Sequence, residues 1–159
     1  MTYSLRKITL ATSAIALTLS LVPTTSVQAA MITYSFSGTT DSGSLNNESY
    51  SGTFSFDDSD LTGSFLEFLP ILDVTFKFLG TTFDQSDAVA TPTANFSFGQ
   101  FLGLSYSVDN FEPTFSIIAG FPSINDAYFA YDTNTGNAGT GNISYSTVNS
   151  VPEPLTILG

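Results

Sequence analysis

A short acidic stretch has the residue types that could supply oxygen ligands to calcium: Asp57, Asp58 and Asp60. The stretch Asp58-x-Asp60-x-Thr62-Gly63 follows the first half of an EF-hand loop, where alternate side chains face the ion and glycine allows the sharp turn. The twelfth position is Leu69, whereas an EF-hand has a glutamate there. Since Asp and Gly are also the residues that turns require, an ordinary strand-to-strand turn is the alternative to a calcium site.

Two other acidic stretches admit a chemical interpretation. Asp132-x-Asn134-x-Gly136-Asn137 again places oxygen donors at alternate positions, which is a second weak calcium-like pattern. Asp84 and Asp87 form a carboxylate pair of the kind that acts as acid and base in glycoside hydrolysis. That reaction needs a cleft and one carboxyl group kept protonated by burial, whereas both aspartates lie in a polar stretch. We expect turns and surface charges at both places, and we do not expect an enzyme.

The composition excludes several kinds of chemistry. The 159 residues include no His, no Cys and no Trp, so Ser-His-Asp catalysis, ordinary zinc sites and disulfides are ruled out. The formal net charge is −11, with 3 Lys and Arg against 14 Asp and Glu. A chain this acidic cannot neutralise phosphates, so we expect no nucleic acid partner. Calcium, neutral glycans and other proteins remain open as partners.

Residues 1–29 have the three parts of a secretory signal peptide. Arg6 and Lys7 form a basic start, the apolar stretch 8–22 follows, and small residues precede a cleavage point between Ala29 and Ala30. The apolar stretch is shorter than the ~20 residues that a membrane-spanning helix needs. We therefore predict a cleaved signal helix and export through the Sec route. Cleavage would leave Lys77 as the only basic residue.

The remaining chain has the pattern of β-strands. Apolar and hydroxyl-bearing residues alternate with period two, which is typical of half-buried antiparallel strands. The clearest alternating stretches are 32–36, 50–56, 74–78, 102–108, 115–117, 129–131 and 143–145. Turn-forming residues separate them, so we predict an all-β fold: one antiparallel β-sandwich or jelly-roll-like domain over residues 30–148. The apolar run 65–72 should lead into a central strand, with room for a helical turn before Pro70.

The 15 Phe and 7 Tyr have two interpretations. They could form an aromatic platform that binds glycans, or they could fill the core of the sheet. Most of them fall on one parity of the strands, which favours the core. The exceptions expected at the surface are tyrosines, because their hydroxyl can stay in water: Tyr50, Tyr106, Tyr128 and Tyr131.

The C-terminal segment 149–159 contains a proline-spaced motif made of Val151, Pro152, Glu153, Pro154 and Thr156. In a chain with a signal peptide and a Ser/Thr/Gly-rich β body, this motif resembles that of the PEP-CTERM proteins, which are exported by Gram-negative bacteria, cyanobacteria among them. The stretches 51–58 and 78–83 also resemble small β domains carried by such proteins. The resemblance implies sorting by an exosortase, a membrane protease-transpeptidase. It also implies a transmembrane helix and a basic cluster after the motif, which the sequence lacks; a fragment or a lost tail would account for this.

Taken together, the sequence predicts a non-enzymatic exported protein of the cell surface or extracellular matrix. Its expected partners are the exosortase and either an exopolysaccharide or further copies of itself. The alternative is a calcium-dependent, lectin-like glycan-binding module that uses the aspartates at 57–60. No cofactor other than calcium is expected.

Overall fold

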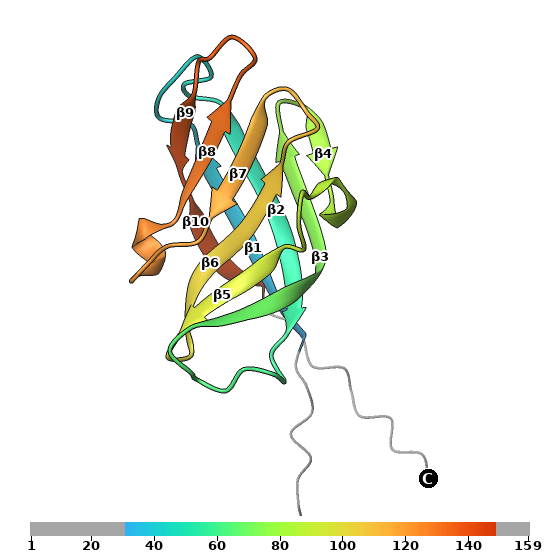
Figure 1. The fold of residues 1–159 in the computed structure, drawn as a ribbon, viewed down its shortest axis with the longest axis vertical. Helices are drawn as coiled ribbons and strands as arrows, with labels where there is room; N and C mark the ends of the chain where they lie inside the picture. The colour runs from blue at the N-terminus through green and yellow to red at the C-terminus, as the bar shows by residue number, and fades with distance from the viewer. Residues whose placement is uncertain (1–30, 149–159) are drawn as a thin grey trace, which may run out of the picture.

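Ten strands account for more than half of residues 31–148, the part of the chain that the computed structural model describes (Figure 1). They are β1 (Met31–Thr39), β2 (Ser49–Asp57), β3 (Glu67–Phe78), β4 (Thr81–Phe83), β5 (Thr93–Ser97), β6 (Gln100–Val108), β7 (Thr114–Ile118), β8 (Tyr128–Asp132), β9 (Gly139–Asn142) and β10 (Ser144–Val148). Two short 3₁₀ helices lie between strands: η1 (Gln85–Asp87) and η2 (Ile124–Asp126). The prediction of an all-β fold is confirmed. Each alternating stretch of the sequence lies in a strand except 143–145, which begins at Ile143 between β9 and β10 and runs into β10.

The strands form one antiparallel sheet in the order β10-β1-β2-β3-β5-β6-β7-β8-β9, with β4 paired to β3. The sheet folds over, so that β10, β1 and β2 lie behind β6, β7 and β8 (Figure 1). One fold is in β3, which pairs through residues 67–70 with β5 and through 71–78 with β2. On the opposite side the chain, and not the sheet, crosses between the layers at Ile143, which joins the two edge strands β9, paired with β8, and β10, paired with β1. The architecture is therefore sandwich-like, but its two layers belong to one continuous sheet.

Aromatic rings fill the space between the layers. Phe76 and Phe129 have no exposed surface, and the ring of Phe76 lies 5.0 Å from that of Phe115 between centroids. The ring of Phe78 lies 5.1 Å from that of Phe129 across the same space. Each fully buried Phe stabilises the fold by about 1.5–3 kcal/mol relative to an exposed one. The core interpretation is confirmed for most of the aromatic residues.

The expectation that four tyrosines are exposed is wrong for three of them. Tyr50, Tyr106 and Tyr131 are buried, while Tyr128 is exposed as predicted. The buried hydroxyls donate to backbone carbonyl oxygens of Asn142, Asp84 and Ser42, respectively. A tyrosine can therefore lie in the core without an unsatisfied hydroxyl, because a loop or, for Tyr50, the end of β9 brings a carbonyl within reach.

The apolar run before Pro70 forms no helical turn. Residues from Glu67 onward are already in β3, and Pro70 pairs with Thr93 of β5. The strand tolerates Pro70 because it lies next to an irregularity, at the point where β3 leaves β2 for β5. The next residue restores the pairing, since the amide of Ile71 donates to the carbonyl oxygen of Pro92 over 3.0 Å.

Candidate functional site

The outer face of β10, β1, β2 and β3 carries two adjacent rows of hydroxyl groups. The strand registers place four residues side by side in each row, and these are Ser144, Ser37, Ser51 and Lys77 in one row and Ser146, Ser35, Thr53 and Thr75 in the other. Because side chains alternate along a strand, the neighbours Phe36, Phe54 and Phe76 point into the core. The aromatic core thus dictates which hydroxyls face outward and brings them together across four strands.

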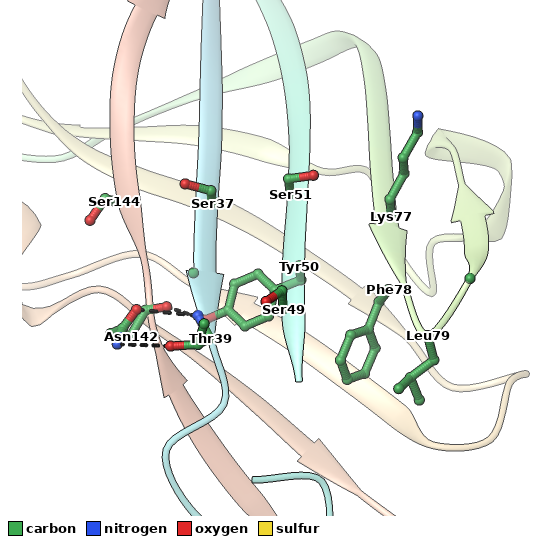
Figure 2. A pocket seen from close by; sticks show the side chains of 12 residues that line it. Ser37, Thr39, Ser49, Tyr50, Ser51, Lys77, Phe78, Leu79, Asn142 and Ser144 are labelled. Atoms are coloured by element: carbon green, nitrogen blue, oxygen red, sulfur yellow. Dashed lines mark hydrogen bonds between the residues drawn. The ribbon is translucent and has the colours of Figure 1, made fainter. Parts of the chain in front are cut away.

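A groove of about 550 Å³ runs over the first of these rows (Figure 2). A second hollow of about 450 Å³ continues it over the other row and shares Ser37, Ser51, Lys77 and Ser144. The sticks in Figure 2 show Ser144, Ser37, Ser51 and Lys77 on neighbouring strands, with Tyr50, Phe78 and Leu79 at one end. We call the two together the hydroxyl groove.

One end of the hydroxyl groove is held by Asn142. Its side-chain oxygen accepts a hydrogen bond of 3.3 Å from the amide of Thr39, and its carbonyl oxygen accepts one from the hydroxyl of Tyr50. Burial, assisted by the nearby charge of Asp41, raises the pKa of Tyr50. The Tyr50 hydroxyl is therefore a neutral donor at physiological pH, and it ties β2 to the end of β9.

Lys77 gives the groove its charge. It is exposed and is the only basic residue between positions 31 and 148. The other side chains of the two rows are Ser and Thr, which both donate and accept hydrogen bonds. Such a surface matches a polyhydroxylated polymer, and Lys77 could pair with one anionic substituent of that polymer.

The three aspartates of the predicted calcium site lie where β2 ends and the next loop begins. Oδ1 of Asp57 accepts a 2.8 Å hydrogen bond from the amide of Ser59, and this hydrogen bonding lowers the Asp57 pKa. The amide of Leu61 donates to the carbonyl oxygen of Asp58 over 3.0 Å, which makes this segment a turn. Asp60 is exposed.

Within residues 31–148, no three acidic side chains are grouped so that they could hold a metal ion. Calcium binding at Asp57, Asp58 and Asp60 stays a prediction that a melting experiment tests. A rise in melting temperature on adding millimolar calcium, lost in Asp58→Ala/Asp60→Ala, would support it. An unchanged melting temperature would contradict it, together with the lectin-like alternative.

The other two acidic stretches are held by local hydrogen bonds. Asp84 and Asp87 form a capping box around η1, in which Asp84 Oδ1 accepts from the Ser86 amide over 2.7 Å and Asp87 Oδ2 from the Asp84 amide over 2.9 Å. Hydrogen bonds from Ser86, its hydroxyl first, lower the pKa of Asp84. The stretch 132–137 contains a turn closed by the Gly136 amide, which donates to the carbonyl oxygen of Thr133 over 2.8 Å. The turn interpretation is confirmed at 132–137, whereas Asp84 and Asp87 belong to the short 3₁₀ helix η1 and its cap.

The predicted cleavage point at Ala29 and Ala30 lies outside the described residues, and so do Val151, Pro152, Glu153, Pro154 and Thr156 of the proposed sorting motif. Among residues 31–148, no helix has the length and apolar character needed to cross a bilayer. No family model, curated protein or solved structure matches this chain. The PEP-CTERM resemblance therefore stays a prediction.

The hydroxyl groove was missed in the sequence because no single segment contains it. Its members come from β10, β1, β2 and β3, and β10 is separated from β1 by most of the chain. The available signal was the Ser/Thr parity of each strand, at positions 35 and 37, 51 and 53, and 144 and 146. Joining these stretches requires the strand order, which a period-two pattern does not specify.

Proposed function

We infer that this chain is a non-enzymatic exported protein of the cell surface or extracellular matrix, whose β domain contacts extracellular polysaccharide. The observation that carries the inference is the hydroxyl groove, because its two rows of Ser and Thr offer many hydrogen-bonding groups to a polymer of hydroxyl groups. The acidic charge supports the same choice, since nucleic acids and anionic membranes would be repelled.

Export and sorting are supported by the sequence at the two ends. Residues 1–29 have the three-part signal pattern, and the motif at 151–156 implies an exosortase as the processing partner. In this proposal the protein passes through the Sec route, loses its signal peptide between Ala29 and Ala30, and reaches the surface or the matrix. Self-association is the competing way for such a domain to build a matrix.

The export part is tested by expressing the full chain in an exosortase-bearing host and sequencing the N-terminus of the product. We expect a mature protein that begins at Ala30 and is found at the cell surface or in the medium. Replacing Pro152, Glu153 and Pro154 by Ala should change the processed size or the location, whereas the control Glu48→Gln in the β domain should not. An intact N-terminus and a cytoplasmic product would overturn the proposal.

The polysaccharide part is tested with the isosteric double variant Thr53→Val/Thr75→Val. Each change replaces a hydroxyl by a methyl group on the outer face and keeps a β-branched residue in the strand. We expect weaker retention of the protein by the host's extracellular polysaccharide, with an unchanged melting temperature. Thr114→Val, on β7 in the other layer, is the matched control. Equal retention of all three proteins would remove the groove from the proposal.

A further inference from the structure

Four phenylalanines lie outside the core; one of them, Phe68 of β3, is 59% exposed, and the other three gather in loops at the end of the domain opposite the hydroxyl groove. Phe65, Phe98 and Phe121 are 55%, 69% and 56% exposed. The ring centroid of Phe65 lies 5.4 Å from that of Phe98 and 6.3 Å from that of Phe121. They come from the loop before β3, the β5–β6 turn and the loop after β7. We call these three residues the Phe cluster.

Phe98 is placed in this cluster against its backbone preference. It has φ 49° and is followed by Gly99 with φ 74°, and the two residues form the entire turn between Ser97 of β5 and Gln100 of β6. A two-residue hairpin turn with positive φ at both positions favours Asn-Gly, because a bulky side chain is strained in the left-handed region. The turn therefore holds an exposed aromatic ring where Asn would fold better.

The segments that carry the rings are fixed by hydrogen bonds. The amide of Phe98 donates to the carbonyl oxygen of Ser64 over 2.8 Å, which joins the turn to the loop of Phe65. That loop is closed by Glu67, whose Oε1 accepts from the Thr62 amide over 2.6 Å. The amide of Gly120, next to Phe121, donates to the carbonyl oxygen of Leu102 over 2.9 Å. A ligand that binds the rings therefore meets segments already held in place.

The charge of the domain indicates which ligand this is. All acidic residues of the chain except Glu153 lie within 31–148, where Lys77 is the only base. A second copy of the domain carries the same charge and would be repelled, and so would anionic lipids or polymers. An uncharged sugar is not repelled, and the C–H face of a pyranose packs on an aromatic ring. The hydroxyls of Thr62 and Ser64 precede Phe65 in the same loop. They are hydrogen-bonded to each other over 2.7 Å, and the Thr62 hydroxyl donates to Glu67, so what they can offer the edge of the sugar is a hydrogen-bond acceptor.

We propose that Phe65, Phe98 and Phe121 form a carbohydrate-binding site for an uncharged glycan, separate from the hydroxyl groove. The proposal rests on the proposed function in one respect: it takes the extracellular polysaccharide proposed above as the partner and adds that part of this polymer is uncharged. It also explains why a strained aromatic residue occupies the β5–β6 turn. In this proposal the aromatic platform considered from the composition consists of three of the exposed rings, while most of the other rings build the core.

The test is affinity electrophoresis of the purified protein in gels containing dextran or laminarin, two uncharged glucans. The informative variant is Phe98→Asn, because Asn suits the turn and lacks the ring. We expect it to raise the melting temperature by about 2–5 °C and to weaken glucan binding by roughly tenfold or more. A loss of binding with a gain of stability cannot be explained by misfolding. Phe65→Ala and Phe121→Ala should also weaken binding.

Leu79→Asn is the matched control. Leu79 and Gly80 form a two-residue turn between β3 and β4 with the same backbone signs, φ 50° and 76°, but Leu79 lies at the far end of β3. It should gain stability as Phe98→Asn does. Because Leu79 also lines one end of the hydroxyl groove, the control for glucan binding is Val89→Ala, at an exposed apolar residue that belongs to neither site, and this variant should keep full binding. No retardation of the wild type by either glucan, or equal retardation of wild type and Phe98→Asn, would overturn the proposal.

Two further measurements separate other partners. Binding of the wild type to phosphatidylcholine vesicles that is lost in Phe98→Asn, without glucan binding, would overturn the proposal in favour of a membrane contact. A dimer in sedimentation that becomes a monomer in Phe98→Asn would overturn it in favour of self-association. Glucan binding that is lost only in Thr53→Val/Thr75→Val would overturn the Phe cluster as the binding site and support the hydroxyl groove. Failure of the export experiment would contradict only the proposed export, because glucan binding is measured with purified protein.

Discussion

The hydroxyl of Tyr106 donates a hydrogen bond of 2.7 Å to the backbone carbonyl oxygen of Asp84. Tyr106 belongs to β6 and is 2% exposed, whereas Asp84 is the N-cap of η1. The next residue, Gln85, uses its side-chain amide to accept from the Val74 amide and to donate to the Leu72 carbonyl oxygen. One buried tyrosine thus connects β6 and its layer to η1, and η1 in turn holds the irregular part of β3.

Removing this hydroxyl should destabilise the fold measurably. Tyr106→Phe removes this hydrogen bond, while the Asp84 carbonyl oxygen keeps the 3.3 Å hydrogen bond from the Asp87 amide, so we expect the free energy of unfolding to fall by about 0.5–1.5 kcal/mol. Tyr128→Phe, at an exposed position, is the control and should stay within about 0.5 kcal/mol of wild type. Urea unfolding of the two variants measures the difference. Equal stabilities would show that the hydrogen bond makes no net contribution.

The fold should be stable at neutral pH and lose stability in alkali. Burial raises the pKa of Tyr50, Tyr106 and Tyr145 above the ordinary value of 10.0. Because the folded state favours the neutral phenol, their contribution is complete below pH 10 and is lost as the pH rises above it. We expect these phenols to ionise together with unfolding, which ultraviolet absorbance and circular dichroism can follow in parallel. Ionisation near pH 10 with an intact fold would contradict the prediction.

Gly52 is required by the close approach of the Thr75 carbonyl oxygen and of the Phe36 ring. A Cβ at position 52 would press on the carbonyl oxygen of Thr75 and lie 2.5 Å from Cζ of Phe36. We expect Gly52→Ala to destabilise the protein by about 1–3 kcal/mol, as overpacking does. Ser51→Ala, on the adjacent outward position, should be nearly neutral.

A second variant distinguishes overpacking from a general intolerance of the strand. In a Phe36→Leu background the smaller side chain leaves room near position 52, so Gly52→Ala should cost less there than in wild type. Thermal unfolding of the four proteins in this double-mutant cycle gives the coupling directly. Equal costs in both backgrounds would mean that Phe36 is not the obstacle.

The features that the sequence predicts are local to one segment, whereas those that it does not predict depend on contacts between distant segments. Strand positions and the inward parity of residues such as Phe54 and Phe76 follow from the period-two pattern, which each segment carries by itself. The buried tyrosines were assigned wrongly because their carbonyl partners lie far along the chain, as Asn142 does from Tyr50. The hydroxyl groove and the Phe cluster depend on the strand order for the same reason. Gly99 is a turn-forming residue, but a phenylalanine before it does not predict that the rings of Phe65 and Phe121 lie nearby.

The carboxylate of Glu67 should make the loop of the Phe cluster sensitive to acid. Its Oε1 accepts from the amide and the hydroxyl of Thr62, and Oε2 is shielded from water without a hydrogen bond of its own. The hydrogen bond from the Thr62 amide is the main cause that lowers the Glu67 pKa below the ordinary value of 4.5. Since the folded state favours the charged form, the stabilisation is complete above pH 4.5 and is lost as the pH falls through the lowered pKa.

Amide hydrogen exchange can test this residue separately from the other acids. Asp57 and Asp84 also have lowered pKa values, so global stability reports all three groups, whereas the Thr62 and Phe98 amides report the loop. We expect their protection factors to fall in acid in the wild type, and to be low already at neutral pH in Glu67→Gln. Asp60→Asn, exposed in the same loop and measured without calcium, should behave as wild type. Protection that is independent of pH in the wild type would show that the loop is held by its backbone and not by the Glu67 charge.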